Sequence, residues 1–382
     1  MTPAREIPVT SNNFMPPLET GKLSQKLLHW FAEEQRDLPW RKTSNPYFIW
    51  VSEVMLQQTQ VQTVIPYYLR FIDRFPTVDS LAVADLNDVL KIWEGLGYYA
   101  RARNLQKAAK IVSTELNSQV PEDYSGFRTL PGVGDYIAAA VQSIAFGRPI
   151  ATVDGNVKRV LSRLFRINQP VNLTTAKNHF VDVAAEILDV KKPGDFNQAM
   201  MELGALICKP SIPVCDQCPV STFCQAFEYK KTADFPKRNK RKQVPTYQIA
   251  VGVVLKNDRM LITLRKPEGL LGGLWEFPGG KTEEGESSEQ ACLREIKEET
   301  NLDIRVERSL AMIKHAYTHF KIVMEVFICQ HVSGRVRLNG PVDHRWISFE
   351  QIKKYPFPKA NHKVFSLLGS HLASERKIPV SE

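Results

Sequence analysis

The sequence predicts an all-α domain followed by a smaller α/β domain. From about Leu23 to Phe227, apolar residues recur at spacings of three and four, as in Leu27 and Phe31, behind Ser24, a residue type favoured at helix N-caps. Runs of β-branched residues that alternate with polar ones are scarce there and become frequent only after residue 246. At 382 residues the chain also exceeds the usual size of one domain.

A basic segment separates the two predicted domains. Residues 230–245 carry seven Lys or Arg and two Pro among few apolar residues, so we expect a solvated linker over 229–246. The polar, Pro-rich residues 1–22 lack the layout of a signal peptide and predict a disordered arm.

The second domain is predicted over residues 247–370, with a tail over 371–382. Its expected elements are strands at 247–255, 260–264, 322–329 and 346–349, a charged helix at 287–300 and a last helix from 361.

Charge and hydropathy narrow the class of protein. The formal net charge of +9 fits a polyanionic partner such as nucleic acid, although it does not require one. No apolar run reaches the length of about 18–20 residues that a membrane-spanning helix needs, so we expect no membrane partner. We therefore expect a cytoplasmic protein, associated with the nucleoid, whose thiols stay reduced.

Four cysteines are crowded into a short loop: Cys208, Cys215, Cys218 and Cys224, in the spacing C-x6-C-x2-C-x5-C. Four thiolates on one polar loop suit a metal, and the spacing alone leaves both tetrahedral zinc and a cubane iron–sulfur cluster open.

A turn rich in glycine lies between two predicted helices. The segment Leu130–Gly134 (LPGVG) would bring backbone N–H groups to a helix start, which is a site for phosphate that needs no charged side chain. Asp154 follows twenty residues later, directly before Gly-Asn, where an Asp is ordinarily a helix N-cap.

Together these motifs resemble the helix-hairpin-helix DNA glycosylase superfamily of endonuclease III and MutY. The blocks LPWR, VSEVMLQQTQV, GLGYYARARNL and FNQAMMELGALIC resemble the adenine DNA glycosylase (MutY) family in particular, over residues 23–228. The resemblance implies an all-α glycosylase domain whose four cysteines hold a [4Fe–4S] cluster. Tyr136 stands where relatives that also cut the strand carry a lysine, and tyrosine cannot form an imine, so we expect a monofunctional glycosylase.

The resemblance also implies roles for individual residues. Glu53 lies in an otherwise apolar stretch, which raises a carboxyl pKa and suits it to protonate the departing adenine. Asp154 and Tyr136 would attend the sugar cation, and Arg41, Trp40 and Gln198 would form the adenine pocket. Lesion and DNA contacts are expected from Gln58, Thr59, Leu96, Tyr98, Gly132 and Gly134. Lys158 and the arginines 101, 103, 159 and 163 are candidates for phosphate contacts.

Residues 247–370 resemble the Nudix fold, and specifically the 8-oxo-dGTP pyrophosphatase MutT. The Nudix box runs from Gly280 to Leu302 and departs from the family pattern only at Asn301, which replaces a glycine and still suits a left-handed helix C-cap. Glu295, Glu298 and Glu299 share one helix face and could hold Mg²⁺. Thr318 and His319 stand where the MutY family reads the lesion.

The resemblance implies excision of adenine mispaired with 8-oxoguanine or guanine in double-stranded DNA, by a monomer. One alternative is a dual enzyme that also hydrolyses 8-oxo-dGTP, and another is a non-catalytic DNA-damage-binding protein, against which Glu53 and Asp154 argue. A thymine or pyrimidine glycosylase is a further alternative, against which Arg41 and the second domain argue.

Overall fold

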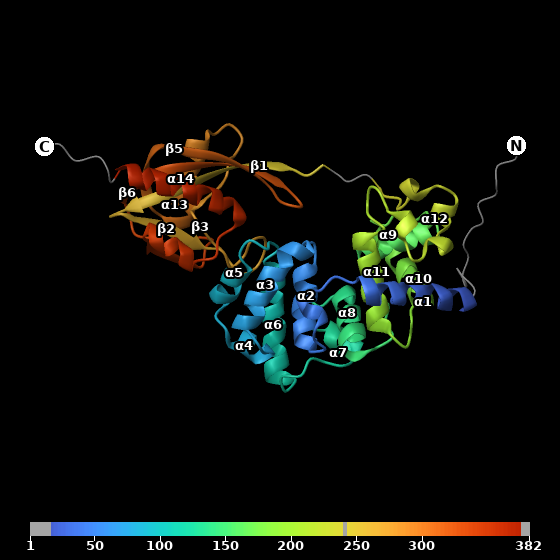
Figure 1. Cartoon of the computed structure of the whole chain (residues 1–382). Helices are drawn as coiled ribbons and strands as arrows, with labels where there is room; N and C mark the ends of the chain where they lie inside the picture. Colours follow the sequence, from blue (N-terminus) through green and yellow to red (C-terminus); the bar gives the residue numbers. More distant parts are fainter. Residues whose placement is uncertain (1–16, 240–242, 376–382) are drawn as a thin grey trace, which may run out of the picture. The chain divides into compact units, whose positions relative to one another are not determined.

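The computed structural model describes residues 17–239 and 243–375 (Figure 1). They group into two compact units. The first unit contains the described residues up to Gln58 and residues 114–239. The second unit contains Thr59–Ser113 and the described residues from 243 onward. The domain boundaries expected from the sequence stay predictions.

The first unit is helical. Its α-helices are α1 (Pro17–Glu34), α2 (Pro46–Leu56), α7 (Tyr124–Arg128), α8 (Asp135–Phe146), α9 (Gly155–Leu164), α10 (Lys177–Glu186), α11 (Pro193–Leu206) and α12 (Gln225–Glu228). Short 3₁₀ helices lie at Pro39–Arg41, Thr174–Ala176, Cys215–Gln217, Ser221–Phe223 and Thr232–Asp234. Apolar faces of α1, α9, α10 and α11 share one core. No strand occurs within residues 17–239, as the sequence predicted.

The second unit combines helices with one mixed sheet. Its helices are α3 (Val61–Arg74), α4 (Val78–Val83), α5 (Leu86–Trp93), α6 (Ala100–Glu115, which ends in the first unit), α13 (Ser288–Thr300) and α14 (Lys359–Glu375), with a 3₁₀ helix at Phe349–Lys354. Its strands are β1 (Thr246–Lys256), β2 (Arg259–Leu264), β3 (Trp275–Glu276), β4 (Gly279–Lys281), β5 (Asp303–Ala316), β6 (Lys321–Ser333) and β7 (Asp343–Ile347).

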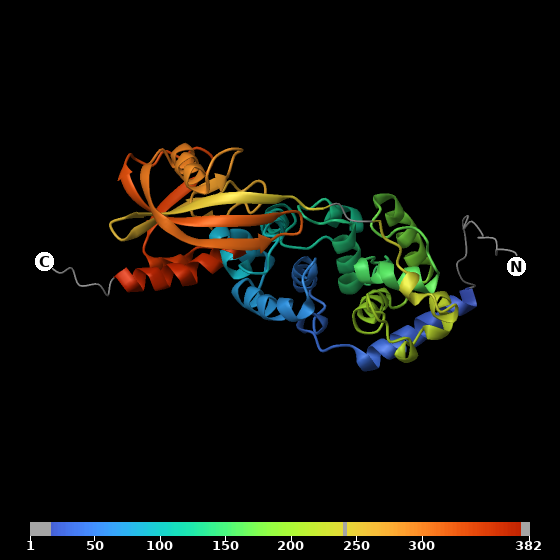
Figure 2. The ribbon, with the colours of Figure 1, turned by 90° about the horizontal axis from the view of Figure 1, so that it is seen from above.

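The sheet has the order β3-β2-β1-β6-β5, with β7 beside β2 and β4 beside β1. Strands β1 and β6 pair in parallel, with Ala250 opposite Glu325, and the other pairs are antiparallel. Side chains of β1 alternate between two cores, so Val251 and Val253 pack with α14 while Ala250 and Val254 pack with α13. The two helices therefore cover opposite faces of the sheet (Figure 2).

Helices of the second unit also contact its sheet domain. The Glu94 carboxylate, after α5, accepts the Phe357 N–H at 2.8 Å, and Arg103 on α6 donates to the Gly272 carbonyl at 2.6 Å. Arg103 is only 7% exposed, so it is a packing residue and not the phosphate contact that its charge suggested.

Three local features differ from the sequence expectations. Helix α1 begins at Pro17, inside the expected arm, because Pro fits the first helical turn. Ser24 consequently lies inside α1, where it donates to Asp189 at 2.9 Å. Strand β5 was not expected, because most of its side chains are exposed and give no apolar alternation. Residues 1–16, 240–242 and 376–382 of the expected arm, linker and tail lie outside the described residues.

No helix within the described ranges has the length and apolar character that a membrane crossing requires.

Asn301 is the C-cap of α13, as predicted: its φ is +61° and its N–H bonds the Lys297 carbonyl. Asn301→Ala should lower the free energy of unfolding by about 1 kcal/mol, because Ala adopts the left-handed conformation less readily. Asn301→Gly should match the parent. Urea denaturation of the full chain measures both, and equal stability of the Ala and Gly variants would show that the cap conformation contributes nothing.

Candidate active site

The Gly-rich turn joins α7 to α8 and fixes where α8 begins. Gly132 has a φ of +79°, a conformation that side chains with a Cβ rarely adopt, while Gly134 is the N-cap of α8. A Cβ at Gly134 would meet nothing within 4 Å, so this glycine leaves open space in front of the helix start. This is the geometry expected of a backbone phosphate site.

Glu53 and Tyr136 meet between α2 and α8. The Tyr136 hydroxyl, on the first turn of α8, donates to Glu53 Oε2 at 2.7 Å. Glu53 is 4% exposed, and burial raises its pKa to about 7. The nearby Asp154 raises this pKa too, while the Tyr136 hydrogen bond and Arg41 lower it. A carboxyl group that is half protonated near neutral pH can act as a general acid.

Asp154 is a helix cap and also lines a pocket. It is the N-cap of α9, where Oδ1 accepts the Val157 N–H at 2.7 Å and Oδ2 accepts Asn156 Nδ2 at 2.9 Å. Burial raises its pKa, although these hydrogen bonds oppose the shift. Asp154 is therefore the helix N-cap that its sequence indicated and also lines the pocket, while its catalytic role stays a prediction.

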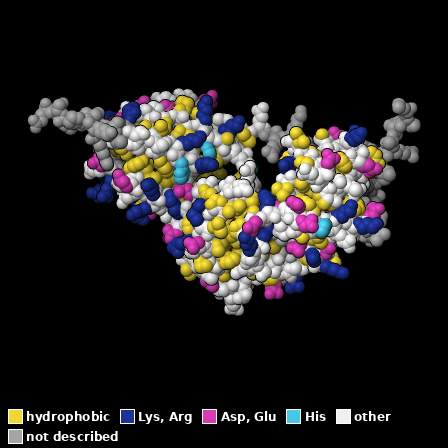
Figure 3. Space-filling model, viewed as in Figure 1, with side chains coloured by type: hydrophobic (Ala, Val, Ile, Leu, Met, Phe, Trp, Pro, Cys, Tyr) yellow, Lys and Arg dark blue, Asp and Glu magenta, His cyan; other side chains and the backbone are white. Residues whose placement is uncertain are grey.

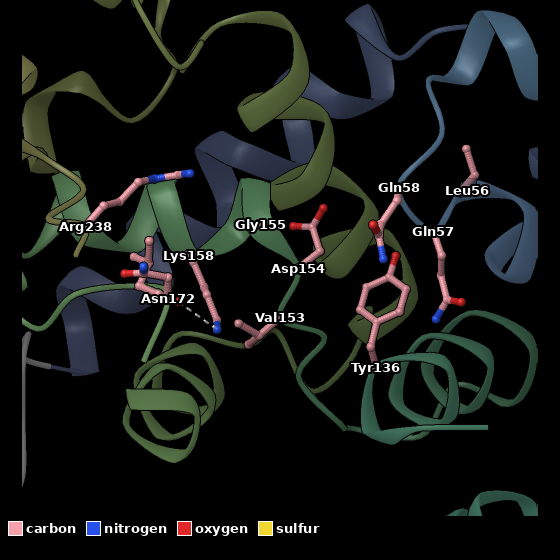
Figure 4. A pocket seen from close by; sticks show the side chains of 11 residues that line it. Leu56, Gln57, Gln58, Tyr136, Val153, Asp154, Gly155, Lys158, Asn172 and Arg238 are labelled. Carbon is pink, nitrogen blue, oxygen red and sulfur yellow. Dashed lines mark hydrogen bonds between the residues drawn. The ribbon is translucent and has the colours of Figure 1, made fainter. Parts of the chain in front are cut away.

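A cavity of about 620 Å³ surrounds this carboxylate (Figure 4). It is lined by Leu56, Gln57, Gln58, Tyr136, Val153, Asp154, Gly155, Lys158, Val171, Asn172 and Arg238. The structure thus brings together Gln58, Tyr136 and Asp154 from the predicted set. Asn172 and Arg238 were missed, because neither stands in a motif that resembles the family.

The predicted adenine-pocket residues form a buried polar group instead of lining this cavity. Arg41 donates to both carboxylate oxygens of Glu202, at 3.0 and 3.1 Å, and to Gln198 at 3.3 Å. Trp40, its neighbour, is buried. Arg36 makes two further side-chain hydrogen bonds to Glu202, at 2.8 and 2.6 Å. Glu202 was missed by the sequence reasoning, although a lone acid in the apolar block FNQAMMELGALIC was a usable signal.

Burial would raise the pKa of Glu202, but its hydrogen bonds from Arg36 and Arg41 outweigh burial and lower that pKa to about 2. Glu202 is therefore ionised at neutral pH. It fixes the guanidinium of Arg41 in one orientation.

Two of the residues expected to contact the DNA have left-handed backbone. Gln58 has a φ of +58° and Tyr98 a φ of +50°, conformations that are uncommon away from glycine and that collect at functional sites. Within the second unit, the hydroxyls of Tyr98 and Thr318 share a hydrogen bond. Arg101 donates to the Thr59 hydroxyl and to the Leu96 carbonyl. The role expected of His319 stays a prediction.

The four clustered cysteines line one small cavity together with Arg163. The Arg163 guanidinium donates to Cys208 Sγ at 3.3 Å. Burial raises the pKa values of Cys215, Cys218 and Cys224, and the neighbouring thiols raise them further. Sulfurs that share a cavity and accept a charged hydrogen bond fit a metal–thiolate centre. Within residues 17–239 and 243–375, however, no three His, Cys, Asp or Glu side chains are positioned to bind one metal ion together.

A chain of hydrogen bonds joins the pocket to the cysteine loop. Asn156 bonds Asp154, and its own side-chain oxygen accepts from Arg159 at 2.8 Å. Arg159 in turn donates to the Cys208 carbonyl at 2.8 Å. Arg159 and Arg163 are 5% and 2% exposed and bind loop carbonyls, so they are scaffold residues and not the predicted phosphate contacts.

The carboxylates of the predicted Nudix box are partly paired. Arg294 bonds Glu286, Glu295 and Glu298. Glu299 accepts the Gly279 N–H, and burial, followed by repulsion from Glu276 and Glu295, raises its pKa to about 7. A Cβ at Gly280 would meet the Glu295 carboxylate at 2.2 Å, so a larger residue there would push the end of this flexible side chain aside.

Two family models match this chain. The "HhH-GPD superfamily base excision DNA repair protein" model matches residues 51–179, and the NUDIX domain model matches residues 250–367. A solved thermostable thymine-DNA glycosylase is 28% identical with a TM-score of 0.51, over 56% of this chain and 98% of that one. The class of protein is therefore a base-excision DNA glycosylase with a helix-hairpin-helix domain followed by a Nudix domain.

Whole-chain relatives narrow the class further. The adenine DNA glycosylase of Mus musculus is 34% identical over 92% of this chain and 78% of its own length, and that of Homo sapiens is 34% identical over 89% and 72%. This chain belongs to the adenine DNA glycosylase family. It is a DNA repair enzyme that acts on DNA.

Replacing Glu202 tests its ion pairs with Arg36 and Arg41. Glu202→Gln should lower the free energy of unfolding by about 3 kcal/mol at pH 7, because it leaves two guanidinium groups without their anion. The pair stabilises above pH 4.5 and loses this effect as pH falls toward 2, so the difference from the parent should shrink over that range. Glu33→Gln, on the exposed side of α1, is the control. Equal denaturation midpoints for the two variants would contradict the assignment.

Proposed function

We propose that this enzyme excises adenine mispaired with 8-oxoguanine or guanine in duplex DNA, with Glu53 as general acid. The observation that supports this most is the buried Glu53 carboxyl, with a pKa of about 7, hydrogen-bonded to Tyr136 at the edge of the pocket that Asp154 lines. Adenine leaves poorly unless it is protonated, so a neutral acid at this place matches the chemistry that the family performs.

In the proposed reaction, Glu53 donates its proton to N7 of the extruded adenine. The N9–C1′ bond then breaks, and its electron pair leaves with the base. The Asp154 carboxylate, held by Val157 and Asn156, stabilises the positive charge that develops at C1′, either by Coulomb attraction or as a transient adduct that preserves stereochemistry. Water supplies the hydroxyl of the abasic product. Tyr136 offers no amine, so the strand stays uncut.

The cysteine loop would hold a [4Fe–4S] cluster through Cys208, Cys215, Cys218 and Cys224. The shared cavity and the Arg163 hydrogen bond support a metal–thiolate centre, and the resemblance of this loop after α11 to the iron–sulfur loop of the glycosylase superfamily favours a [4Fe–4S] cluster over zinc. When bound, the cluster would cross-link the loop, and Arg159 would transmit that rigidity to Asn156 and Asp154. We further propose that the enzyme acts as a monomer on nucleoid DNA.

The assignment of Glu53 is tested by single-turnover excision on A:8-oxoG and A:G duplexes, read out by alkali cleavage. Glu53→Gln should slow adenine release more than about hundredfold while leaving duplex binding intact. In the parent, the rate should fall about tenfold per pH unit above pH 7, because the acid is then ionised. Tyr136→Phe removes a bond that lowers this pKa and should move the decline to higher pH.

A Glu53→Gln rate within tenfold of the parent would show that another group protonates the base. Excision from A:8-oxoG no faster than from A:T would contradict the proposed substrate instead, whatever Glu53 does.

A second activity, hydrolysis of 8-oxo-dGTP to 8-oxo-dGMP and pyrophosphate, is supported by the crowding of Glu276, Glu295 and Glu299, which a Mg²⁺ ion would relieve. Glu298, on the same helix face, would be a further ligand. Glu298→Gln in the full chain should abolish this hydrolysis and leave adenine excision unaltered. No turnover by the parent above a no-enzyme control, at any Mg²⁺ or Mn²⁺ concentration, would leave a domain that only recognises the lesion. In that case Thr318→Val or His319→Ala should weaken discrimination between 8-oxoguanine and guanine.

A further inference from the structure

The first residues of the basic linker are fixed against the glycosylase pocket. The Lys237 carbonyl accepts the Val171 N–H at 3.0 Å. Asn239 exchanges two hydrogen bonds with Asn172, since its N–H bonds Asn172 Oδ1 at 3.0 Å and its carbonyl accepts Asn172 Nδ2 at 3.1 Å. Arg163 holds the preceding turn through the Phe235 carbonyl at 3.1 Å. Lys237, Arg238 and Asn239 are exposed, as expected of a solvated linker, and these hydrogen bonds also make the segment part of the pocket wall.

Arg238 lies between these two anchored residues, and its side chain lines the cavity around Asp154. Figure 4 shows Arg238, Lys158 and Asn172 on one side of Asp154, with Tyr136 and Gln58 on the other side. One wall of the pocket is therefore cationic, with Arg238 and Lys158. The opposite wall carries Tyr136, which bonds the proposed proton donor Glu53.

Neither cation on this wall pairs with a carboxylate in the part of the chain that the structure describes. Within the described ranges, no carboxylate forms a salt bridge with Arg238 or Lys158, and the Lys158 amine bonds only the Val171 carbonyl, at 3.3 Å. Lys158 is half-buried, and burial together with Lys177 lowers its pKa. Figure 3 shows Lys and Arg side chains at many places on the face in view, with Asp and Glu side chains among them, so positive charge by itself does not single out this wall.

A guanidinium, an ammonium and a side-chain amide all donate hydrogen bonds to anionic oxygens. A nucleotide whose sugar faces Asp154 brings its own phosphodiesters to the rim of this cavity. We propose that Arg238, with Lys158 and Asn172, forms a phosphate subsite that binds the phosphodiester adjoining the extruded nucleotide. The proposal rests on the proposed function, since it assumes that one nucleotide is extruded into this pocket. Binding of the phosphodiester by the linker residue Arg238 would offset part of the free-energy cost of extrusion.

Binding of the full chain to a duplex with a tetrahydrofuran abasic analogue opposite guanine tests the subsite, because this analogue carries no base. Arg238→Gln should weaken binding and lower the slope of log affinity against log salt by about one. Arg238→Lys should restore the slope. Lys237→Gln is the matched control, since this neighbouring cation lies over the Phe235 ring and does not line the pocket.

A methylphosphonate scan identifies the phosphate. Neutral linkages are placed one at a time on the strand that carries the analogue. The parent should lose affinity at a linkage next to the analogue, and Arg238→Gln should show no further loss at that linkage. Equal slopes for Arg238→Gln and Lys237→Gln, or additive losses at every linkage, would overturn the subsite. An error in the adenine assignment would appear separately, as absent excision from A:8-oxoG by a parent protein that still binds the analogue.

Discussion

Glu53 places a carboxyl group inside an apolar helix, where ionisation costs free energy and only one hydroxyl, that of Tyr136, directly offsets this cost. The pKa of about 7 is the balance of burial, which raises it most, the Tyr136 hydrogen bond and Arg41, which lower it, and Asp154, which raises it. The neighbouring elements position the groups that set this pKa. The hairpin glycines fix the start of α8 and so place Tyr136, and the cap of α9 places a second carboxylate close enough to raise the same pKa.

Buried arginines give the site its rigidity. Arg36 and Arg41 share Glu202, while Arg159 and Arg163 bind carbonyls around the cysteine loop. Arg41, Arg159 and Arg163 each bond acceptors from more than one part of the chain, and these bonds fix those segments relative to one another. The cations left to meet DNA phosphates are therefore the unpaired ones, and charge alone does not reveal which they are.

Local patterns predicted local structure well. Helical spacing gave the helices of the first domain, and alternation gave four strands of the second. The left-handed cap at Asn301 followed from the resemblance to the Nudix box, which has a glycine there, and from the tolerance of Asn for this conformation. Expectations differed from the structure where a distant contact decided the outcome. Ser24 bonds Asp189 across 165 residues of sequence, and β5 is held by β6 although its own side chains are largely exposed. The contact between Gly280 and the Glu295 carboxylate likewise exists only in the folded chain.

The sequence by itself determined the family, the order of the two domains, the cysteine loop and the two carboxylates Glu53 and Asp154, because motif spacing and apolar context are local properties. Tertiary structure alone decided that Glu202 orients Arg41, that three predicted phosphate-binding arginines are buried, and that Arg238 reaches the pocket. These outcomes depend on which acceptor lies within about 3 Å of a long side chain after the chain has folded, and residues far apart in sequence supply those acceptors.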